Sequence, residues 1–539
     1  MSSLAKLQNR NQRSSRFSNP GLKENIFLMM VFGWSGLSLV LSTLIGSSNY
    51  KNLSSTFISI SLFASGLSLS YIAVNPDSIL TRLFICISIV IFVISVDCYY
   101  NKFTHNLFIH LVNSGYIGVG VYFWLIKLYP ESFPDLWQTI MPSAPQAFNM
   151  LIFCLVFQNV GYYMLWGLLF PLLKPVLNWL NSYKNLANLS FLNKKYEYLI
   201  LFIILASFGL ISRLWNFSIG NIYYTEGSGI PSYISNFLAQ FDQLYVIAWL
   251  YGYALSVQEG LKKNTVTYLT WMLIPIEFLY QFISGSKGRF LKFVILPMAT
   301  VFIVVRQRVS WGAVFILGGI GAFSWLFVYP VLVNYRELMS GITIYDAINT
   351  KELLNQSVQR VLLSSREEYI ETILMPFTLL GRAEQVTAMT SIVHFQVSQE
   401  SNTLWLRLFL FWVPRFLWSD KPEALSENLI GRLSHRLNPG DYTTSVLSTG
   451  PGELFLYYEL WGSSLMVLAG LVFRGLNESI SPFKFYTPFR VAVFVAFLSQ
   501  MKGILSGSFE SGLTGILLQV GVLYLILLVA KILIKPRGY

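Results

Sequence analysis

Long apolar blocks recur along the chain from Ile26 to Ile534, and short polar stretches separate them. A helix needs about 20 apolar residues to cross the hydrocarbon core of a membrane, and the blocks approach that length. They are continuous rather than alternating, which is typical of helices and not of the strands of a membrane barrel. The pattern predicts helices at residues 26–46, 53–74, 79–97, 106–126, 147–170, 197–215, 236–257, 265–284, 290–305, 311–333, 453–473, 488–504 and 512–533.

The composition agrees with a membrane protein. Of the 539 residues, 54% are hydrophobic and 12% are charged, whereas a soluble chain carries about 25% charged residues. This excludes a disordered chain, a coiled coil and a soluble enzyme with one membrane anchor. We expect an all-α fold, a polytopic bundle of 12–14 transmembrane helices with one large, partly helical extracytoplasmic loop. The three cysteines have no metal-ligand spacing, so we expect neither disulfides nor a zinc site.

Lysine and arginine residues indicate which side each loop faces, because membrane proteins concentrate them in the cytoplasm. The net charge of +12 is explained in this way without any nucleic acid. Basic residues occur in 1–24 and in 535–539, so we expect both ends of the chain to be cytoplasmic. The loops after residue 170 alternate as expected. Upstream, five helices cannot join a cytoplasmic N-terminus to a cytoplasmic loop at Lys184. Either one early block does not span, or the stretch around Trp137 together with the long block ending near Trp179 hides another crossing.

One segment breaks the apolar pattern. Residues 335–450, between the transmembrane regions 25–334 and 451–534, hold ten Lys or Arg and twelve Asp or Glu residues. The flanking basic loops place this segment outside the cytoplasm. A loop of this length is usually functional or disordered, and apolar residues at helical spacing between Leu354 and Ile373 favour order. We expect amphipathic helices on the membrane surface, with residues 404–418 dipping partly into it.

A glycine- and serine-rich stretch, Ser284–Arg289 (SGSKGR), follows the predicted helix 265–284 at its outer end. Glycines let backbone N–H groups approach an anion closely, and Lys287 and Arg289 add positive charge. The N-terminus of the next helix adds its dipole. The stretch is a candidate cradle for phosphate or pyrophosphate. The alternative is a polar turn whose basic side chains reach lipid headgroups.

Arginines of the large loop are the next candidates, because a planar guanidinium binds two oxygens of a pyrophosphate at once. A lipid-linked pyrophosphate arrives from the membrane surface, which favours Arg336 and Arg415 at the edges of the loop. Each arginine also has a plainer interpretation as an interfacial anchor or as half of a salt bridge. Further candidate contacts within the loop are Arg432, Arg436 and Trp418.

Two residues are candidates for a general base. His435 lies in a basic cluster of the loop, and histidine side chains commonly exchange protons near neutral pH. Glu453 opens the predicted helix 453–473 at its outer end, where a carboxylate also satisfies the helix dipole. The alternatives are a solvated loop histidine for His435 and this structural role for Glu453.

Several ionisable residues fall inside or close to the predicted helices. Charge within a membrane is costly and usually faces a cavity or a partner. Asp242 and Glu277 are the candidates for ion coupling. The full set is Asp97, Arg213, Asp242, Glu277, Lys502 and Glu510.

Three sequence elements together resemble the O-antigen polymerases, the Wzy-type polymerases of oligosaccharide repeat units. Ser284–Gly288 (SGSKG) resembles their S-G-S-R-G element, with lysine where arginine is common. Pro414–Pro422 (PRFLWSDKP) resembles their P-R-x-x-W-x-x-K-P element at the end of the large loop. Gly450–Gly462 resembles the stretch that opens the next helix. The order of the elements also fits, and the match covers roughly residues 265–475.

This resemblance implies transfer of a growing glycan from one polyprenyl pyrophosphate to the sugar of another lipid-linked repeat unit, on the outer face of a bacterial inner membrane. We expect Glu453 or His435 to take the proton of the attacking hydroxyl. Expected partners are the lipid-linked oligosaccharide and membrane lipids, with a chain-length regulator and a flippase as candidate partner proteins. No cofactor, metal or nucleic acid is expected. The side chains expected to hold the pyrophosphate are Lys287, Arg289, Arg336 and Arg415.

Three alternatives stay open. A ligase that moves a finished glycan onto another acceptor is hardly separated from a polymerase by sequence. A polysaccharide transporter or flippase without chemistry would depend on Asp242, Glu277 and Lys502 and would tolerate a trimmed outer loop. A scaffold subunit of a synthase would have no single indispensable polar residue.

Overall fold

The computed structural model describes residues 60–100 with short gaps before residue 77, then 102–128, 135–166, 195–218, 232–258, 265–283, 296–306, 323–339, 350–374, 380–395, 449–483, 486–506 and 508–534, with a few single residues between them. The chain divides into two compact units, Met1–Phe103 and Thr104–Tyr539, which we describe separately. Every regular element within the described residues is a helix. The predicted helix 26–46 and most of 53–74 lie outside these residues.

The first unit contains α4 (Ile79–Tyr99), which confirms the helix predicted at 79–97. Ser78 is its N-cap, and the Ser78 hydroxyl accepts a hydrogen bond from the backbone N–H of Thr81 at 3.3 Å. The guanidinium of Arg82 is buried and donates to the carbonyl of Ser78 at 2.9 Å. The start of α4 is therefore held by a side-chain cap and by an arginine that folds back over the first turn.

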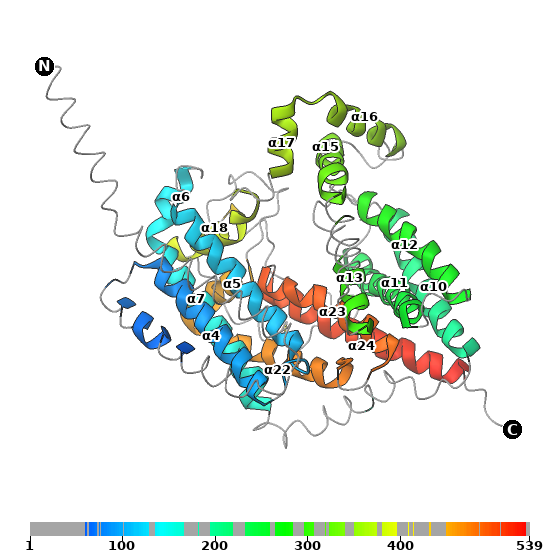
Figure 1. The fold of residues 1–539 in the computed structure, drawn as a ribbon, viewed down its shortest axis with the longest axis horizontal. Coiled ribbons are helices and arrows are strands. Elements are labelled where there is room, and N and C mark those ends of the chain that lie inside the picture. Colours follow the sequence, from blue (N-terminus) through cyan, green and yellow to red (C-terminus); the bar gives the residue numbers. More distant parts are fainter. Residues whose placement is uncertain are drawn as a thin grey trace, which may run out of the picture. The chain divides into compact units, whose positions relative to one another are not determined.

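The second unit is built from helices along its described length (Figure 1). In chain order they are α5 (Leu107–Leu128), α6 (Asp135–Ile140), η2 (Met141–Ser143), α7 (Ala144–Asn159), η3 (Val160–Leu165), α10 (Lys195–Ser218), α11 (Ser232–Gln258), α12 (Thr265–Ile283), α13 (Leu296–Arg306), η5 (Ser324–Val328), α15 (Tyr329–Met339), α16 (Thr350–Leu363), α17 (Arg366–Leu374), α18 (Leu380–His394), α21 (Gly450–Tyr458), η7 (Glu459–Leu465), α22 (Met466–Ile480), α23 (Pro488–Ser506) and α24 (Phe509–Ile534).

Six helical runs within the described residues are long and apolar enough to cross a membrane. The chain is therefore a multi-pass membrane protein. The helices predicted at 236–257, 265–284 and 488–504 are also confirmed as helices, by α11, α12 and α23. The six runs are Ile79–Tyr99, Leu107–Leu128, Gln138–Leu165, Glu197–Trp215, Gly450–Ile480 and Phe509–Ile534.

The structure refines three of the predicted boundaries. The region around Trp137 belongs to α6, whose six residues are too short to cross a membrane and lead through η2 into α7. α15 continues to Met339, so Arg336 lies within a helix and not after it. Polar residues extend this helix beyond the apolar block from which it was predicted. The helix predicted at 453–473 changes at Glu459 from α21 to the 3₁₀ turn η7.

α11 is the centre of the second unit. It packs along α10, α12, α13 and α23, and α23 in turn packs on α24 (Figure 1). The side chains of Tyr245, Trp249 and Tyr251 on α11 are buried in these contacts. The Gln243 amide donates to the carbonyl of Ala496 at 3.3 Å and ties α11 to α23. The helices that carry Arg213, Asp242, Glu277, Lys502 and Glu510 therefore form one packed group.

Two glycines let α22 approach the α7–η3 run at backbone distance. A Cβ atom added to Gly161 would overlap the carbonyl of Val467, and one added to Gly470 would overlap the carbonyl of Gln158. Small residues at such contacts are the usual way in which membrane helices pack closely. Gly161 lies in η3, a short π-helical segment that interrupts the regular α-helical hydrogen bonding of the run.

A cluster of amide side chains joins α5 to α7 inside the bundle. The Asn113 amide donates to the Asn159 side-chain oxygen at 2.9 Å, and the Gln158 amide donates to the Asn113 oxygen at 3.0 Å. The Tyr116 hydroxyl donates to the Gln158 side-chain oxygen at 2.9 Å. All of these side chains are buried. Each finds its partner on the neighbouring helix, as polar groups away from water require.

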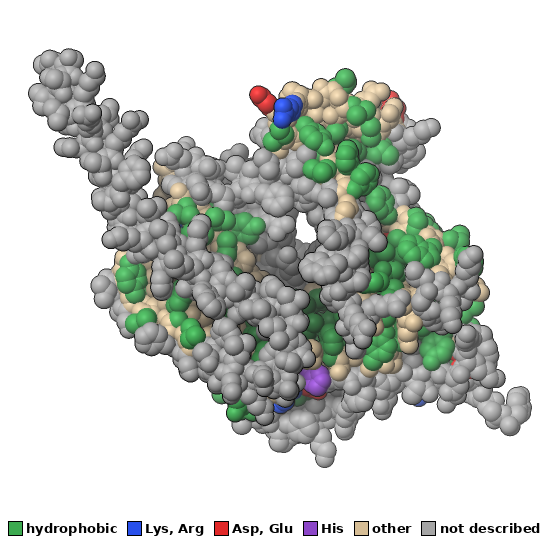
Figure 2. Space-filling view, viewed as in Figure 1, with side chains coloured by type: hydrophobic (Ala, Val, Ile, Leu, Met, Phe, Trp, Pro, Cys, Tyr) green, Lys and Arg blue, Asp and Glu red, His purple; other side chains and the backbone are tan. Residues whose placement is uncertain are grey.

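The large segment 335–450 contains α16, α17 and α18, so the helical order predicted between Leu354 and Ile373 is confirmed. α15 packs against α16, and the Tyr369 hydroxyl of α17 donates to the carbonyl of Leu326 at 2.5 Å. Leucines at the end of α16 are exposed, with Leu363 at 84%. In Figure 2 charged side chains are conspicuous over α16 and α17. α18 differs from these two helices, because it packs against α5, α7 and α21 within the bundle.

Gly470→Ala tests the close approach of α22 to α7. The added methyl group would meet the carbonyl of Gln158, and overpacking of this kind costs about 1–3 kcal/mol. We expect the free energy of unfolding in detergent to fall by that amount. Gly521→Ala on α24 is the control, since nothing lies within 4 Å of its added Cβ, and it should leave stability unchanged or raise it. Equal stability of the two variants would contradict the packing described here.

Candidate functional site

Most residues predicted to bind pyrophosphate lie outside the described part of the chain. Arg336 is on α15, but its side chain is not among the described ones, and Arg432 has a partly exposed side chain. The convergence of these cations on one cavity therefore stays a prediction. The residues outside the description are Lys287, Arg289, Arg415, Trp418, His435 and Arg436.

Gly450–Gly462, the third of the elements that resemble the polymerases, begins at the start of α21. Its first residues are tightly packed. Thr449 is the N-cap, and its hydroxyl accepts from the backbone N–H of Gly452 at 3.1 Å. Pro451 stands in the first turn, where its missing N–H leaves no bond unmade. A Cβ atom at Gly450 would overlap the carbonyl of Ile504. Residues of this element therefore hold α21 directly against the end of α23.

Glu453 lies in the first turn of α21 with 2% of its surface exposed. Its carboxylate accepts a hydrogen bond from the backbone N–H of Phe509 at 2.6 Å and another from the side chain of Ser508. Phe509 is the first residue of α24, so one carboxylate stands at the N-termini of two helices, where their dipoles favour negative charge. This geometry is the structural role that the sequence offered as an alternative. A role of Glu453 as general base stays a prediction.

Strained backbone flanks α21 on both sides. Thr449 has φ 61° and Glu459 has φ 53°, and within the described residues these are the non-glycine residues with positive φ. Such conformations cost about 1–3 kcal/mol each and persist where the surroundings enforce them, often at active sites and ligand clamps. For a β-branched residue such as Thr449 the conformation is a genuine outlier. The strain marks α21 as a candidate functional element.

A serine–histidine pair joins the large segment to the bundle, and the sequence did not predict it. Ser143 Oγ and His394 Nδ1 share a hydrogen bond of 3.0 Å. Ser143 is the N-cap of α7 but makes no capping bond with its side chain, and His394 ends α18. The bond fixes the imidazole ring in one orientation at the place where α18 meets α7. Nothing in the sequence pointed to Ser143 and His394 as partners, because 251 residues separate them.

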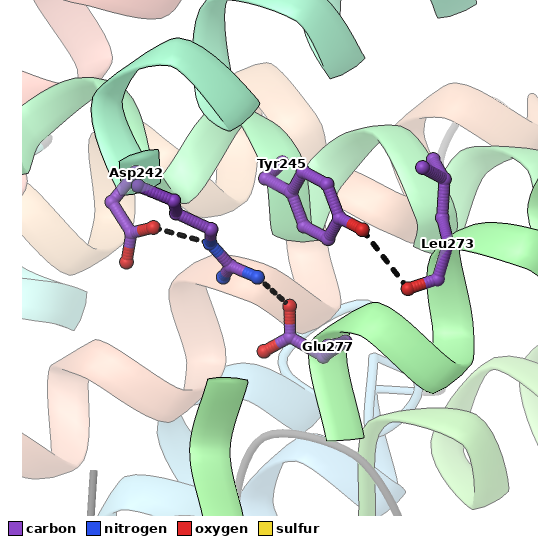
Figure 3. Close-up of polar contacts among 5 residues, drawn as sticks. Asp242, Tyr245, Leu273 and Glu277 are labelled. Carbon is purple, nitrogen blue, oxygen red and sulfur yellow. Dashed lines mark hydrogen bonds and ion pairs between the residues drawn. The ribbon is translucent and has the colours of Figure 1, made fainter. Parts of the chain in front are cut away.

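A buried charge cluster links α10, α11 and α12, and we name Arg213, Asp242 and Glu277 the charge triad. Arg213 Nε donates to Asp242 Oδ1 at 2.5 Å, and Arg213 Nη1 donates to Glu277 Oε2. Figure 3 shows the two carboxylates approaching from different helices. Arg213 and Glu277 are buried, whereas Asp242 keeps 26% of its side chain exposed. All three residues are intramembrane charges predicted from the sequence, and the structure shows that they pair.

Two tyrosine rings cover the guanidinium of the charge triad. The Arg213 Cζ atom lies 4.1 Å from the ring centroid of Tyr245 and 4.3 Å from that of Tyr280. The Tyr245 hydroxyl donates to the carbonyl of Leu273 at 3.0 Å, which holds the ring between α11 and α12 (Figure 3). Stacking on aromatic rings is favourable for arginine. The guanidinium is thus fixed by two rings and two carboxylates at once.

Glu277 of the charge triad lies close in sequence to the predicted phosphate cradle. α12 ends at Ile283, and Ser284–Arg289 follows directly. Glu277 is therefore about 9 Å from the end of α12 at the rise of an α-helix. Arg213 lies in the last turns of α10, which ends at Ser218. Glu277 and Arg213 therefore both lie near the outer end of their helices. The basic loops predict that these ends face away from the cytoplasm.

No family model matches the chain, and no curated protein and no solved structure matches it. Within the described helices, no group of three or more His, Cys, Asp or Glu side chains is arranged to hold a metal ion. What the structure offers is a strained, buried helix at α21 and a charge triad between α10, α11 and α12.

Arg213→Gln tests the cost of the charge triad. The change removes the cation between two carboxylates and leaves uncompensated charge in the bundle, which costs about 3–5 kcal/mol. We expect this loss in the free energy of unfolding in detergent. Arg360→Gln on the exposed face of α16 is the control and should stay within about 0.5 kcal/mol of the unchanged protein. Equal effects of both substitutions would show that the triad contributes nothing to stability.

Substitutions of Glu453 test its capping role. Glu453→Ala removes the acceptor of the buried Phe509 N–H, and leaving such a donor unsatisfied costs about 1–3 kcal/mol. Glu453→Gln keeps an acceptor oxygen, so it should lose clearly less stability in the same unfolding measurement. Glu459→Gln, at an exposed side chain, serves as the control. If the alanine and glutamine variants were equally stable, the hydrogen bond to α24 would not be the reason why this carboxylate is buried.

Proposed function

We propose that the chain is a membrane glycosyltransferase that polymerises oligosaccharide repeat units carried on polyprenyl pyrophosphate. In this proposal a donor glycan leaves its pyrophosphate and joins a sugar hydroxyl of a second lipid-linked repeat unit. The product is a longer bacterial surface polysaccharide, such as O-antigen, capsule or exopolysaccharide, still attached to its lipid. The reaction takes place at the outer face of the inner membrane.

The observation that carries the proposal is the setting of α21. This helix is formed by the sequence element that resembles the polymerase stretch opening the helix after the large loop. It is buried along most of its length, and strained residues, Thr449 and Glu459, stand at its two ends. Strain that the surroundings enforce is characteristic of sites that hold a ligand in one geometry. A helix that only anchors a protein in the membrane needs no such strained residues.

The chemistry requires positive charge beside the lipid. The donor already carries a pyrophosphate leaving group, so the main demand is to stabilise the negative charge that builds on it. One preorganised hydrogen-bond donor can contribute about 2.7–4 kcal/mol to such a transition state. A general base adds roughly 10²–10⁴-fold, and we propose Glu453 or His435 for it. The proposed pyrophosphate ligands are Lys287, Arg289, Arg336 and Arg415.

The position of α18 supports an enzyme whose large segment takes part in its work. α18 belongs to the segment 335–450, and its residues Thr390, Ser391 and Ile392 are buried. It packs against α21 as well as α5 and α7. Removing the segment would expose the core beneath α18. A transporter with a dispensable outer loop would not need this arrangement.

The charge triad favours a second candidate, a polysaccharide transporter or flippase coupled to an ion gradient. Intramembrane carboxylates that are paired with arginine are typical of ion and proton pathways. Asp242 and Glu277 are the residues on which this candidate depends. It predicts movement of the lipid-linked glycan across the membrane without lengthening. A ligase would instead transfer the glycan once, to a different acceptor.

The proposed reaction can be reconstituted. Purified full-length protein in liposomes, given lipid-linked repeat units without nucleotide sugar or added metal, should lengthen the glycan, visible as a ladder on a gel. Arg415→Ala should lower the rate by about 10²–10³-fold, the usual effect of losing one such donor. Lys531→Ala, at the exposed end of α24, should leave the rate unchanged.

Two outcomes would contradict the proposed mechanism, and a third would contradict the polymerase itself. Full activity of the Arg415→Ala protein would remove the proposed role of the loop arginine. Activity that a chelator abolishes would show that a metal ion carries the pyrophosphate charge. Glycan that crosses the liposome membrane without growing, with loss of this movement in Asp242→Asn, would establish the transporter.

A further inference from the structure

The run Gly450–Ile480 bends sharply at Glu459. On a straight α-helix, residues eight apart in sequence are about 12 Å apart, yet a Cβ atom added to Gly462 would overlap the carbonyl of Leu454. The chain therefore folds back after α21, and Glu459, with its φ of 53°, stands at the turn. The turn brings η7 back against α21.

Three exposed side chains belong to this turn. They are Glu459, Trp461 and Ser464, and Trp461 is 82% exposed. Gly462 and Ser463 between them are buried, because that side of η7 packs on α21 and α7. Residues three apart lie on the same face of a 3₁₀ helix, and the Ser464 hydroxyl donates to the carbonyl of Trp461 at 2.8 Å. An indole ring and a hydroxyl therefore share one outward face, with a carboxylate two residues before the ring.

The length of the run predicts that Trp461 lies at the outer surface of the membrane. From Trp461 to Ile480 the chain rises about 30 Å at the usual rises of 3₁₀- and α-helices, which is the thickness of the hydrocarbon core. The basic residues of 474–490 predict that Ile480 is at the cytoplasmic end. Trp461 is therefore expected on the side of the large segment 335–450, whose helix α18 packs against α21.

Lipid is the usual neighbour of an exposed tryptophan in a membrane protein, and α12 shows a face of that kind. Trp271 is exposed there together with Met272 and Ile276, which are apolar. Trp461 instead lies beside the exposed carboxylate of Glu459, which is costly in hydrocarbon. The same carboxylate repels the phosphate of a lipid headgroup. The surface around Trp461 therefore suits an uncharged partner with both an apolar face and polar groups.

We propose that Glu459, Trp461 and Ser464 form a sugar-binding subsite, which holds a pyranose ring of the lipid-linked glycan. A pyranose presents C–H groups on one face, and these pack against the negative face of an aromatic ring. Its hydroxyls donate charge-assisted hydrogen bonds to a carboxylate such as Glu459. The Ser464 oxygen is a further acceptor. Because Glu459 repels phosphate, the subsite contacts the sugar and not the pyrophosphate.

The subsite deepens the proposed function and rests on it, because a glycan is what that reaction moves. Binding in one geometry requires that the carboxylate and the ring keep a fixed relation. The strained backbone at Glu459 provides this, since surroundings that enforce such a conformation leave it little freedom. The subsite thus gives the bend after α21 a task in positioning one sugar.

Hydroxyl-radical footprinting of the full-length protein in liposomes, read by mass spectrometry, tests the subsite. The probes are the methyl glycosides of glucose, galactose, mannose, rhamnose, N-acetylglucosamine and N-acetylgalactosamine. Sorbitol is the control, because it has the hydroxyls of a sugar and scavenges radicals but has no ring. Trp461 should be oxidised in sorbitol and should lose most of this oxidation with at least one glycoside. Trp271 should stay unoxidised in all samples.

Trp461→Ala tests the same contact in the glycan-lengthening assay. The side chain is exposed, so the substitution should leave the fold intact. Without the ring, we expect the KM for the lipid-linked repeat unit to rise about tenfold with little change in kcat. Trp271→Ala, at an exposed tryptophan of an apolar face, is the matched control and should leave the KM unchanged.

The outcomes separate this subsite from the proposed reaction. Trp461 that resists oxidation as Trp271 does would show that it faces lipid, which would overturn the subsite. Oxidation of Trp461 that none of the glycosides reduces, or an unchanged KM in the Trp461→Ala protein, would also overturn it. In these cases lengthening by the unchanged protein would still support the polymerase. Protection of Trp461 by a glycoside without any lengthening would remove the polymerase and keep the subsite.

Discussion

Separation of polar groups from water is the constraint on which this structure depends. The chain is apolar both inside the bundle and on the surfaces that face lipid, so a buried charge or amide must find its partner on another helix. Arg213 meets carboxylates from α11 and α12, and Asn113 meets amides from α7. Close packing at small residues already restricts the rotation of each helix. These polar pairs choose one rotation for each helix.

The two parts of the candidate site solve this problem in different ways. Around α21, the carboxylate of Glu453 is stabilised by backbone N–H groups, the Ser508 side chain and helix dipoles. Between α10, α11 and α12, carboxylates surround an arginine instead. The first arrangement is a fixed part of the architecture, since most of its donors belong to the backbone. The second depends on side chains from three different helices.

Hydropathy predicted most of the described helices correctly. An apolar helix of the second unit is surrounded by apolar groups whether it faces lipid or another helix, so its apolar sequence alone reveals it. It could not predict which helices meet. Ser143 and His394 are 251 residues apart, and Arg213 and Glu277 are 64 apart. The sequence predicted that Glu453 stabilises the N-terminus of its own helix. It did not predict that the same carboxylate also accepts a hydrogen bond at the N-terminus of α24. The strain at Thr449 and Glu459 left no signal, since neither residue type prefers that conformation. The predicted pyrophosphate ligands remain expectations of the sequence.

The amide cluster has a consequence for how the protein is made. During insertion, α5 reaches the translocation channel before α7, and alone it would present Asn113 to lipid without a partner. Gln158 and Asn159, which complete its hydrogen bonds, are synthesised only afterwards. Pairing with α7 therefore satisfies amide groups that α5 alone would expose to lipid. Three amide side chains thus make the paired helices better suited to lipid than α5 would be alone.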